Sequence, residues 1–105
     1  MNSQYKKGVV ELCVMKILSN RAMSTFEVLE IISNDLSVNE NTVYPILRRL
    51  TNDNFLEVKK NNIGVGAPRK YYYLTESGFA RLEDLETEWN NFIKGISKIM
   101  GGKYE

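Results

Sequence analysis

Apolar residues recur at three- and four-residue spacing along most of the chain, which is the spacing of a helix with one buried face. From Lys6 to about Ser19 this pattern predicts a first helix, which Asn20 and Arg21 end. Its predicted buried stripe consists of Val9, Val10, Cys13, Val14, Ile17 and Leu18. Because the single cysteine lies within this stripe, we interpret it as a core residue and not as a reactive thiol.

A second helix is predicted to begin after Ser24. The segment Ser24-Thr25-Phe26-Glu27 has the form of a capping box, in which a hydroxyl and a carboxylate bond the free backbone amides at the start of a helix. The helix is expected to stop near Asn34. Its predicted apolar positions are Phe26, Leu29 and either Ile31 or Ile32.

A turn through residues 35–38 separates this helix from a third one. Either Ser37 or Asn39 caps the third helix, which runs to about Asn52. Pro45 lies deeper than the first turn, so we expect a local kink and a lost backbone hydrogen bond. The predicted buried stripe consists of Val43, Ile46, Leu47 and Leu50.

After Asn54 the pattern changes to that of strands. Residues 55–60 and 69–74 suit two strands, the second because of its aromatic content. Since side chains alternate along a strand, either Tyr72 or its two neighbours face the core. A long hairpin tip between the strands is predicted from Asn61, Asn62, Gly64, Gly66 and Pro68.

The last predicted helix is capped by Thr75 and ended by Gly101-Gly102. Ile93 and Met100 widen its apolar face, so we expect part of that face to pack on the first helix of the same or a partner chain. The main seam, in steps of three and four, consists of Leu82, Leu85, Trp89, Phe92, Ile96 and Ile99.

The order of these elements is that of a mainly α fold with a two-stranded wing: a winged helix-turn-helix followed by a C-terminal dimerisation helix. Other small α+β domains share this order. We expect a DNA-binding domain over residues 1–75 and a dimerisation helix over 76–105, forming one compact unit. A chain of 105 residues buries a thin core, so packing against a second copy would help it.

Composition changes this picture in two ways. The net charge is only +1, but residues 48–70 hold six basic and two acidic side chains, a local excess that fits a phosphate backbone or, equally, a solvated face. The chain has no histidine and one cysteine, so we expect no enzyme activity, no metal site and no cofactor. No apolar run reaches the ~18 residues of a membrane span and no signal peptide opens the chain, which predicts a cytoplasmic protein without a membrane partner.

Two blocks of sequence resemble the PadR family of transcriptional regulators. Residues 41–50 (NTVYPILRRL) are similar to the family's recognition helix, and residues 66–78 (GAPRKYYYLTESG) to its wing and the start of its last helix. Trp89 falls where family members often place a tryptophan, and the short tail resembles the compact branch with a single C-terminal helix. At Ser24 and Thr25 the chain lacks the family's usual aromatic residue and glycine, which puts any DNA contact there in doubt.

The resemblance implies a repressor that binds a palindromic operator in double-stranded DNA as a homodimer. The third helix would enter the major groove, where Asn can pair with adenine, Arg with guanine and the Thr methyl with thymine. Tyr44 would bond a phosphate or else pack half-buried, and Arg49 would bind DNA or pair with a carboxylate of its own helix or of the wing. The candidate reading residues are Asn39, Asn41, Thr42, Tyr44 and Arg48.

Two further surfaces leave alternatives open. Lys59, Lys60, Arg69 and Lys70 of the wing suit backbone or minor-groove contact, although Lys60 and Lys70 could instead keep an edge strand soluble. In some relatives a tryptophan pair at the dimer interface takes flat aromatic drugs. The seam residues Leu85, Trp89, Phe92 and Ile96 would either bind such a small aromatic effector or form dimer core.

A second functional interpretation is a winged-helix module for protein–protein association, to which DNA binding is incidental. The modest net charge favours it, whereas Arg48, Arg49 and the basic wing favour DNA. Binding to random duplex that falls steeply with salt would distinguish the two.

Overall fold

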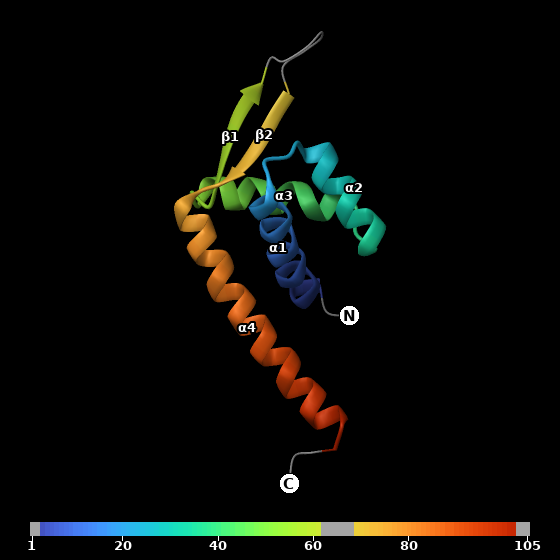
Figure 1. Ribbon diagram of the computed structural model, residues 1–105. Helices are drawn as coiled ribbons and strands as arrows, with labels where there is room; N and C mark the ends of the chain where they lie inside the picture. Colours follow the sequence, from blue (N-terminus) through green and yellow to red (C-terminus); the bar gives the residue numbers. More distant parts are fainter. Residues whose placement is uncertain (1–2, 62–68, 103–105) are drawn as a thin grey trace.

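A computed structural model describes residues 3–61 and 69–102 (Figure 1). Four helices and one antiparallel hairpin follow each other in the predicted order, which confirms the predicted fold class. The elements are α1 (Ser3–Asn20), α2 (Thr25–Asp35), α3 (Glu40–Asn52), β1 (Leu56–Asn61), β2 (Arg69–Leu74) and α4 (Glu76–Met100). The molecule is elongated, with extents of 62 × 28 × 20 Å, because the distal half of α4 leaves the body.

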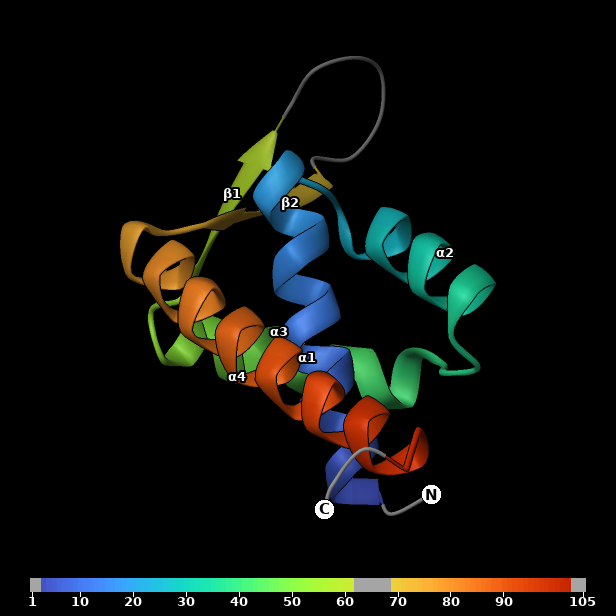
Figure 2. The same cartoon turned by 60° about the horizontal axis from the view of Figure 1, so that its bottom comes forward.

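Helix α1 is the centre of the core. Helices α2, α3 and α4 and strand β2 all contact it, and it lies between α2 and α4 (Figure 2). Val10, Val14 and Leu18 of the predicted stripe are buried, but Val9, Cys13 and Ile17 are only half-buried. Met15, outside that stripe, is fully buried, because α1 has neighbours on more than one side. Partial burial also raises the pKa of the Cys13 thiol, which disfavours the nucleophilic thiolate.

Helix α2 begins at the predicted capping box. The Ser24 hydroxyl accepts a hydrogen bond from the backbone N–H of Glu27, and the Glu27 carboxylate accepts one from the backbone N–H of Ser24. Val28 and Ile32 are the buried residues of the helix. The placement of Phe26 on the apolar face was wrong: its side chain is 69% exposed, because the core meets α2 along the Val28–Ile32 line.

Helix α3 confirms the predicted stripe, since Val43, Ile46, Leu47 and Leu50 are all buried. The side chain of Asn39 caps the helix by accepting a hydrogen bond from the backbone N–H of Asn41 at 2.9 Å. The helix runs unbroken through Pro45, whose ring nitrogen cannot donate the hydrogen bond that the carbonyl of Asn41 would otherwise accept.

Strands β1 and β2 pair in a register that sets Leu56 opposite Leu74 and Val58 opposite Tyr72. This face packs on the body, and Tyr72 is the tyrosine that joins the core. The predicted hairpin tip lies at residues 62–68, outside the described residues. A third piece of backbone, at Met23, bridges Tyr72 through two hydrogen bonds of 3.3 and 2.8 Å.

Helix α4 starts at Thr75, whose hydroxyl accepts a hydrogen bond from the N–H of Gly78 at 3.0 Å. Its first half packs on α1 of the same chain: Leu82 is buried, and an ion pair of 3.3 Å joins Lys16 to Glu86. Every residue from 90 to 100 is exposed. Over the described residues, no helix is long and apolar enough to cross a membrane.

The start of α4 allows no side chain at Gly78. A Cβ there would lie 2.2 Å from the carbonyl oxygen of Phe55 and 2.9 Å from Cδ1 of Leu74, whereas a Cβ at Gly95 would meet nothing within 4 Å. We therefore expect Gly78→Ala to lower the free energy of unfolding by about 1–3 kcal/mol or more. Gly95→Ala should raise it by about 0.5–1 kcal/mol through helix propensity. Urea unfolding at one fixed protein concentration measures both, and a Gly78→Ala protein as stable as the wild type would contradict this packing.

Candidate nucleic-acid interface

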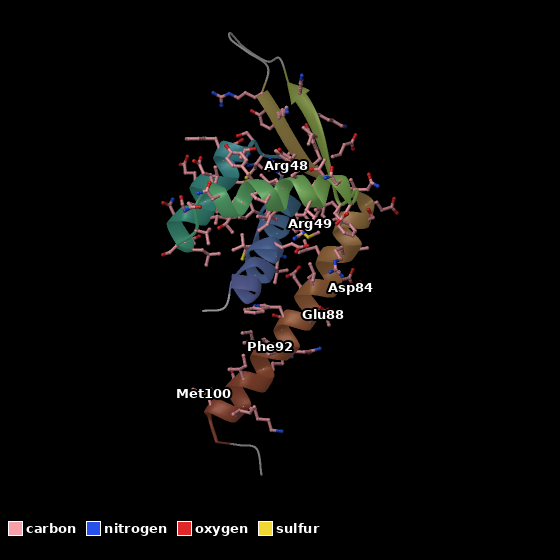
Figure 3. All side chains as sticks on the ribbon, turned by 180° about the vertical axis from the view of Figure 1, so that it is seen from behind. Arg48, Arg49, Asp84, Glu88, Phe92 and Met100 are labelled. Carbon is pink, nitrogen blue, oxygen red and sulfur yellow. The ribbon has the colours of Figure 1, made fainter. Side chains whose placement is uncertain are left out.

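The outer face of α3 carries the predicted reading residues. Asn41, Tyr44 and Arg48 are exposed and Thr42 is half-exposed, while the opposite face of the helix is buried. Arg48 lies on the edge of α3 that faces the wing, as Figure 3 shows from behind. Because the Asn39 side-chain oxygen is bonded to the Asn41 N–H, its amide nitrogen is the group left to donate outward.

Arg49 points the other way. Its guanidinium forms an ion pair of 2.5 Å with the carboxylate of Glu11 on α1, and both side chains are partly buried. Figure 3 places Arg49 on the edge of α3 opposite to Arg48. The expectation that Arg49 pairs with a carboxylate is confirmed, but the partner belongs to α1 and not to α3 or the wing. The pair adds to the buried face of Val43, Ile46, Leu47 and Leu50, which packs α3 on the body and leaves Arg48 outward.

The basic residues of the wing lie beyond the part of the hairpin that packs on the body. Lys59, Lys60, Arg69 and Lys70 are all exposed. Lys60 and Lys70 are directly opposite each other in the strand register, and like charges in that position repel. On the other face, the Lys59 ammonium lies 5.0 Å from the centre of the Tyr73 ring, a cation–π contact.

Hydrogen bonds in the middle of β2 and just beyond its inner end hold the wing in place. At Tyr72, in the middle of the strand, the Met23 bridge ties β2 to the segment that leads into α2. At its inner end the hydroxyls of Thr75 and Ser77 both donate to the carbonyl oxygen of Asn54, at 2.7 and 2.9 Å. Asn54 itself has φ 64°, a left-handed conformation that asparagine tolerates. The wing and α3 are therefore parts of one rigid surface.

A hollow lies between α1 and α4, away from α3 and the wing. It has a volume of about 280 Å³. The Trp89 and Phe92 rings within it are 6.2 Å apart and tilted by 45°. The structure thus brings together three of the four predicted effector residues, Leu85, Trp89 and Phe92, whereas Ile96 is not among the lining residues. The lining residues are Gly8, Val9, Leu12, Leu85, Glu88, Trp89 and Phe92.

The sequence matches the Transcriptional regulator PadR-like family over residues 14–84, more than half of the chain. The chain belongs to this family. A PadR-like transcription factor from Bacteroides fragilis is 35% identical, with a TM-score of 0.78 over 92% of this chain and 95% of that one. The smu.1704 protein of Streptococcus mutans is 29% identical, with a TM-score of 0.87 over 94% of this chain and 92% of that one.

A further PadR-like structure contains nucleic acid. Bacillus subtilis PadR, solved in complex with operator DNA, is 24% identical to this chain, with a TM-score of 0.64. The match covers 72% of this chain and 46% of that one, so it shows a shared fold over part of the larger protein.

Two features of this PadR-like surface escaped the sequence reasoning. The exposed ring of Phe26 lies at the start of α2, where we had expected a buried residue. Glu11 pairs with Arg49 of α3, which is 38 residues away in sequence. A signal for Phe26 was present, since Val28 and Ile32 fit the helix period as well as Phe26 and Leu29 do. No local pattern could have identified Glu11.

The capping box of α2 is expected to make stability depend on pH. Hydrogen bonding from the Ser24 backbone N–H, with help from Arg21 at 3.0 Å, lowers the pKa of Glu27 in the folded protein. The ionised carboxylate thus contributes stability above its unfolded-state pKa of about 4.3, and the contribution is lost as the pH falls through the lower folded-state value. Glu27→Gln should therefore be less stable than wild type at pH 7, and the difference should shrink below about pH 4.3.

Urea unfolding from pH 7 to pH 3 measures this difference. Glu30→Gln, which removes the same charge from an exposed position of α2, is the control for the change in net charge. A Glu27→Gln deficit that stays constant over the whole range would show that the carboxylate does not stabilise the cap.

Proposed function

We propose that this PadR-like regulator is a repressor that binds a palindromic operator as a homodimer. The observation that carries the proposal is the exposed face of α3. Arg48 lies on the edge of this helix that faces the wing, and the wing holds four exposed cations. A helix of this kind fits the major groove, and the flanking cations suit the phosphates on either side. Because such a protein must reach the genome, we propose that it is located in the cytoplasm.

The α3 residues and the wing residues have different roles in this proposal. Arg48, Asn41 and Thr42 read base edges, with Asn39 at the start of the helix beside them. Tyr44, which is 43% exposed, donates its hydroxyl to a phosphate. The wing residues Lys59, Lys60, Arg69 and Lys70 anchor the backbone without reading sequence.

Dimerisation in this proposal uses the part of α4 that its own chain leaves uncovered. Residues 1–75 then form the DNA-binding part and residues 76–105 the dimerisation helix. Phe92 is 50% exposed and Met100 81% exposed, and both lie on the distal half of α4 (Figure 3). The other exposed apolar residues there are Ile93, Ile96 and Ile99. A contiguous apolar surface of this kind marks an interaction site.

The hollow beside Trp89 is the proposed effector site. Its two aromatic rings would stack on a small flat aromatic molecule. Binding of that molecule would cause the protein to dissociate from the operator. If the same residues instead pack against the partner's α4, they form part of the dimer core. Quenching of Trp89 fluorescence by an added aromatic compound, with the dimer intact, would favour the effector site.

The dimer predicts that one charge on the apolar seam of α4 separates the chains. Ile96→Asp should give a monomer at micromolar concentration, because the carboxylate would be buried against apolar side chains. Asn91→Asp adds the same charge about 140° round the helix, and this control should remain dimeric. Sedimentation velocity distinguishes the two species. A wild-type protein that sediments as a monomer would contradict the proposal.

A further prediction distinguishes residues that read bases from residues that bind the phosphate backbone. Arg48→Ala should cost about 1–3 kcal/mol on the operator and much less on random duplex. Lys70→Ala should weaken binding to both by similar factors and reduce the slope of log K against log salt by about 0.9 for each lost phosphate contact. Lys98→Ala, which removes one charge from an exposed position of α4, is the control and should change neither.

The operator itself can be found by footprinting the DNA upstream of the protein's own gene, or by selection from a random duplex library. Two-fold symmetry predicts half-sites about 34 Å apart from centre to centre. Affinity for duplex that barely changes between low and physiological salt would favour a protein-association module instead.

A further inference from the structure

Phe26 is an exposed aromatic residue that neither the core nor the proposed reading face accounts for. Its side chain is 69% exposed although it stands in the first turn of α2. It lines an open hollow of about 430 Å³ between the start of α2 and the outer end of β2. The other lining residues are Ser24, Thr25, Arg69 and Lys70.

The position of this hollow is set by the backbone. The Met23–Tyr72 bridge is antiparallel, so the chain that continues from Met23 into α2 runs alongside the part of β2 that precedes Tyr72. Thr25 and Phe26 therefore come beside Lys70 and Arg69. The hollow thus lies between α2 and the wing, and it continues the basic surface that begins with Lys60 opposite Lys70.

The charges of the hollow favour an anion. Arg69 and Lys70 are exposed cations, and none of the described lining residues is acidic. The nearest carboxylate in sequence, that of Glu27, is bonded to Ser24 and to Arg21 at 3.0 Å. The capping box engages the amides of Ser24 and Glu27, and the two side-chain cations are the charged groups of the hollow that would bind the anion.

We propose that this hollow binds the deoxyribose-phosphate backbone of DNA, with Phe26 packed on a sugar and Arg69 and Lys70 on the adjoining phosphates. A phenyl ring has no hydrogen-bonding group, and the sugar is the apolar part of the backbone. Repulsion between Lys60 and Lys70 is relieved when a phosphate comes between them. The inference rests on the proposed DNA binding and extends the contact from α3 and the wing to α2.

Phe26→Ala tests the sugar contact. It should weaken binding about tenfold or more, both to the selected operator and to a mixed-sequence duplex of 30 base pairs, because the sugar is the same in both. The slope of log K against log salt should stay at the wild-type value, since no charge is lost, whereas Arg69→Ala should reduce it. Phe26→Leu, which keeps an apolar side chain, should lose less. Phe79→Ala removes another exposed ring, 50% accessible on α4, and should bind like wild type.

Hydroxyl-radical footprinting of the operator gives an independent readout, because the radical attacks deoxyribose. The Phe26→Ala complex, formed at saturating protein, should lose protection at one or two sugars in each half-site and keep the rest of the footprint. An unchanged footprint and affinity, with the wild type binding normally, would overturn this inference and leave the proposed function intact. A wild-type protein that binds neither duplex would overturn the proposed function and this inference with it.

Discussion

The burial of α1 is the constraint on which the rest of the structure depends. One helix supplies Val10, Val14, Met15 and Leu18 to a core that α2, α3, α4 and β2 share. The first half of α4 packs on α1, and the helix then leaves the body, so that residues 90–100 are exposed. The second half of α4 keeps an apolar face that this chain does not cover. A small core therefore produces both the rigid DNA-binding body and the exposed arm.

The candidate interface is rigid because it is attached to this core at several points. Glu11 on α1 pairs with Arg49 on one edge of α3, beside the buried face that packs this helix on the body. The Met23 bridge holds β2 beside the start of α2, and the Asn54 carbonyl accepts hydrogen bonds from Thr75 and Ser77. Each attachment joins segments that are distant in sequence. The backbones of α2, α3 and the wing are thus held relative to one another before any ligand binds, which reduces the entropy lost on binding.

Sequence reasoning succeeded where one local pattern allowed one solution. In α3 the apolar residues at 43, 46, 47 and 50 define a single face, so both the core and the outward position of Arg48 followed from the spacing. The capping boxes and caps of α2, α3 and α4 were likewise readable, because a cap uses neighbours in sequence.

The same reasoning failed where tertiary contacts chose between equivalent solutions. In α2, Val28 fits the helix period as well as Phe26 does, and the packing of α2 against α1, α3 and β2 buries Val28 and leaves Phe26 exposed. The partner of Arg49 depended on how α1 crosses α3, which no local pattern records. The hollow between α2 and the wing could not be foreseen for this reason, since its two sides are more than forty residues apart in sequence.

In the proposed dimer, the spacing of the half-sites depends on residues at the start of α4, which are distant from the reading residues of α3. The two copies of α3 are related by the way α4 leaves the body, and that direction is set where Gly78 packs against the carbonyl of Phe55 and the side chain of Leu74. The N–H of Thr75 also donates to the Phe55 carbonyl, at 3.1 Å. Operator spacing and base reading thus belong to different residues. On this proposal, substitutions in α3 would change which bases are read, whereas substitutions at the start of α4 would change the separation at which two half-sites are bound together.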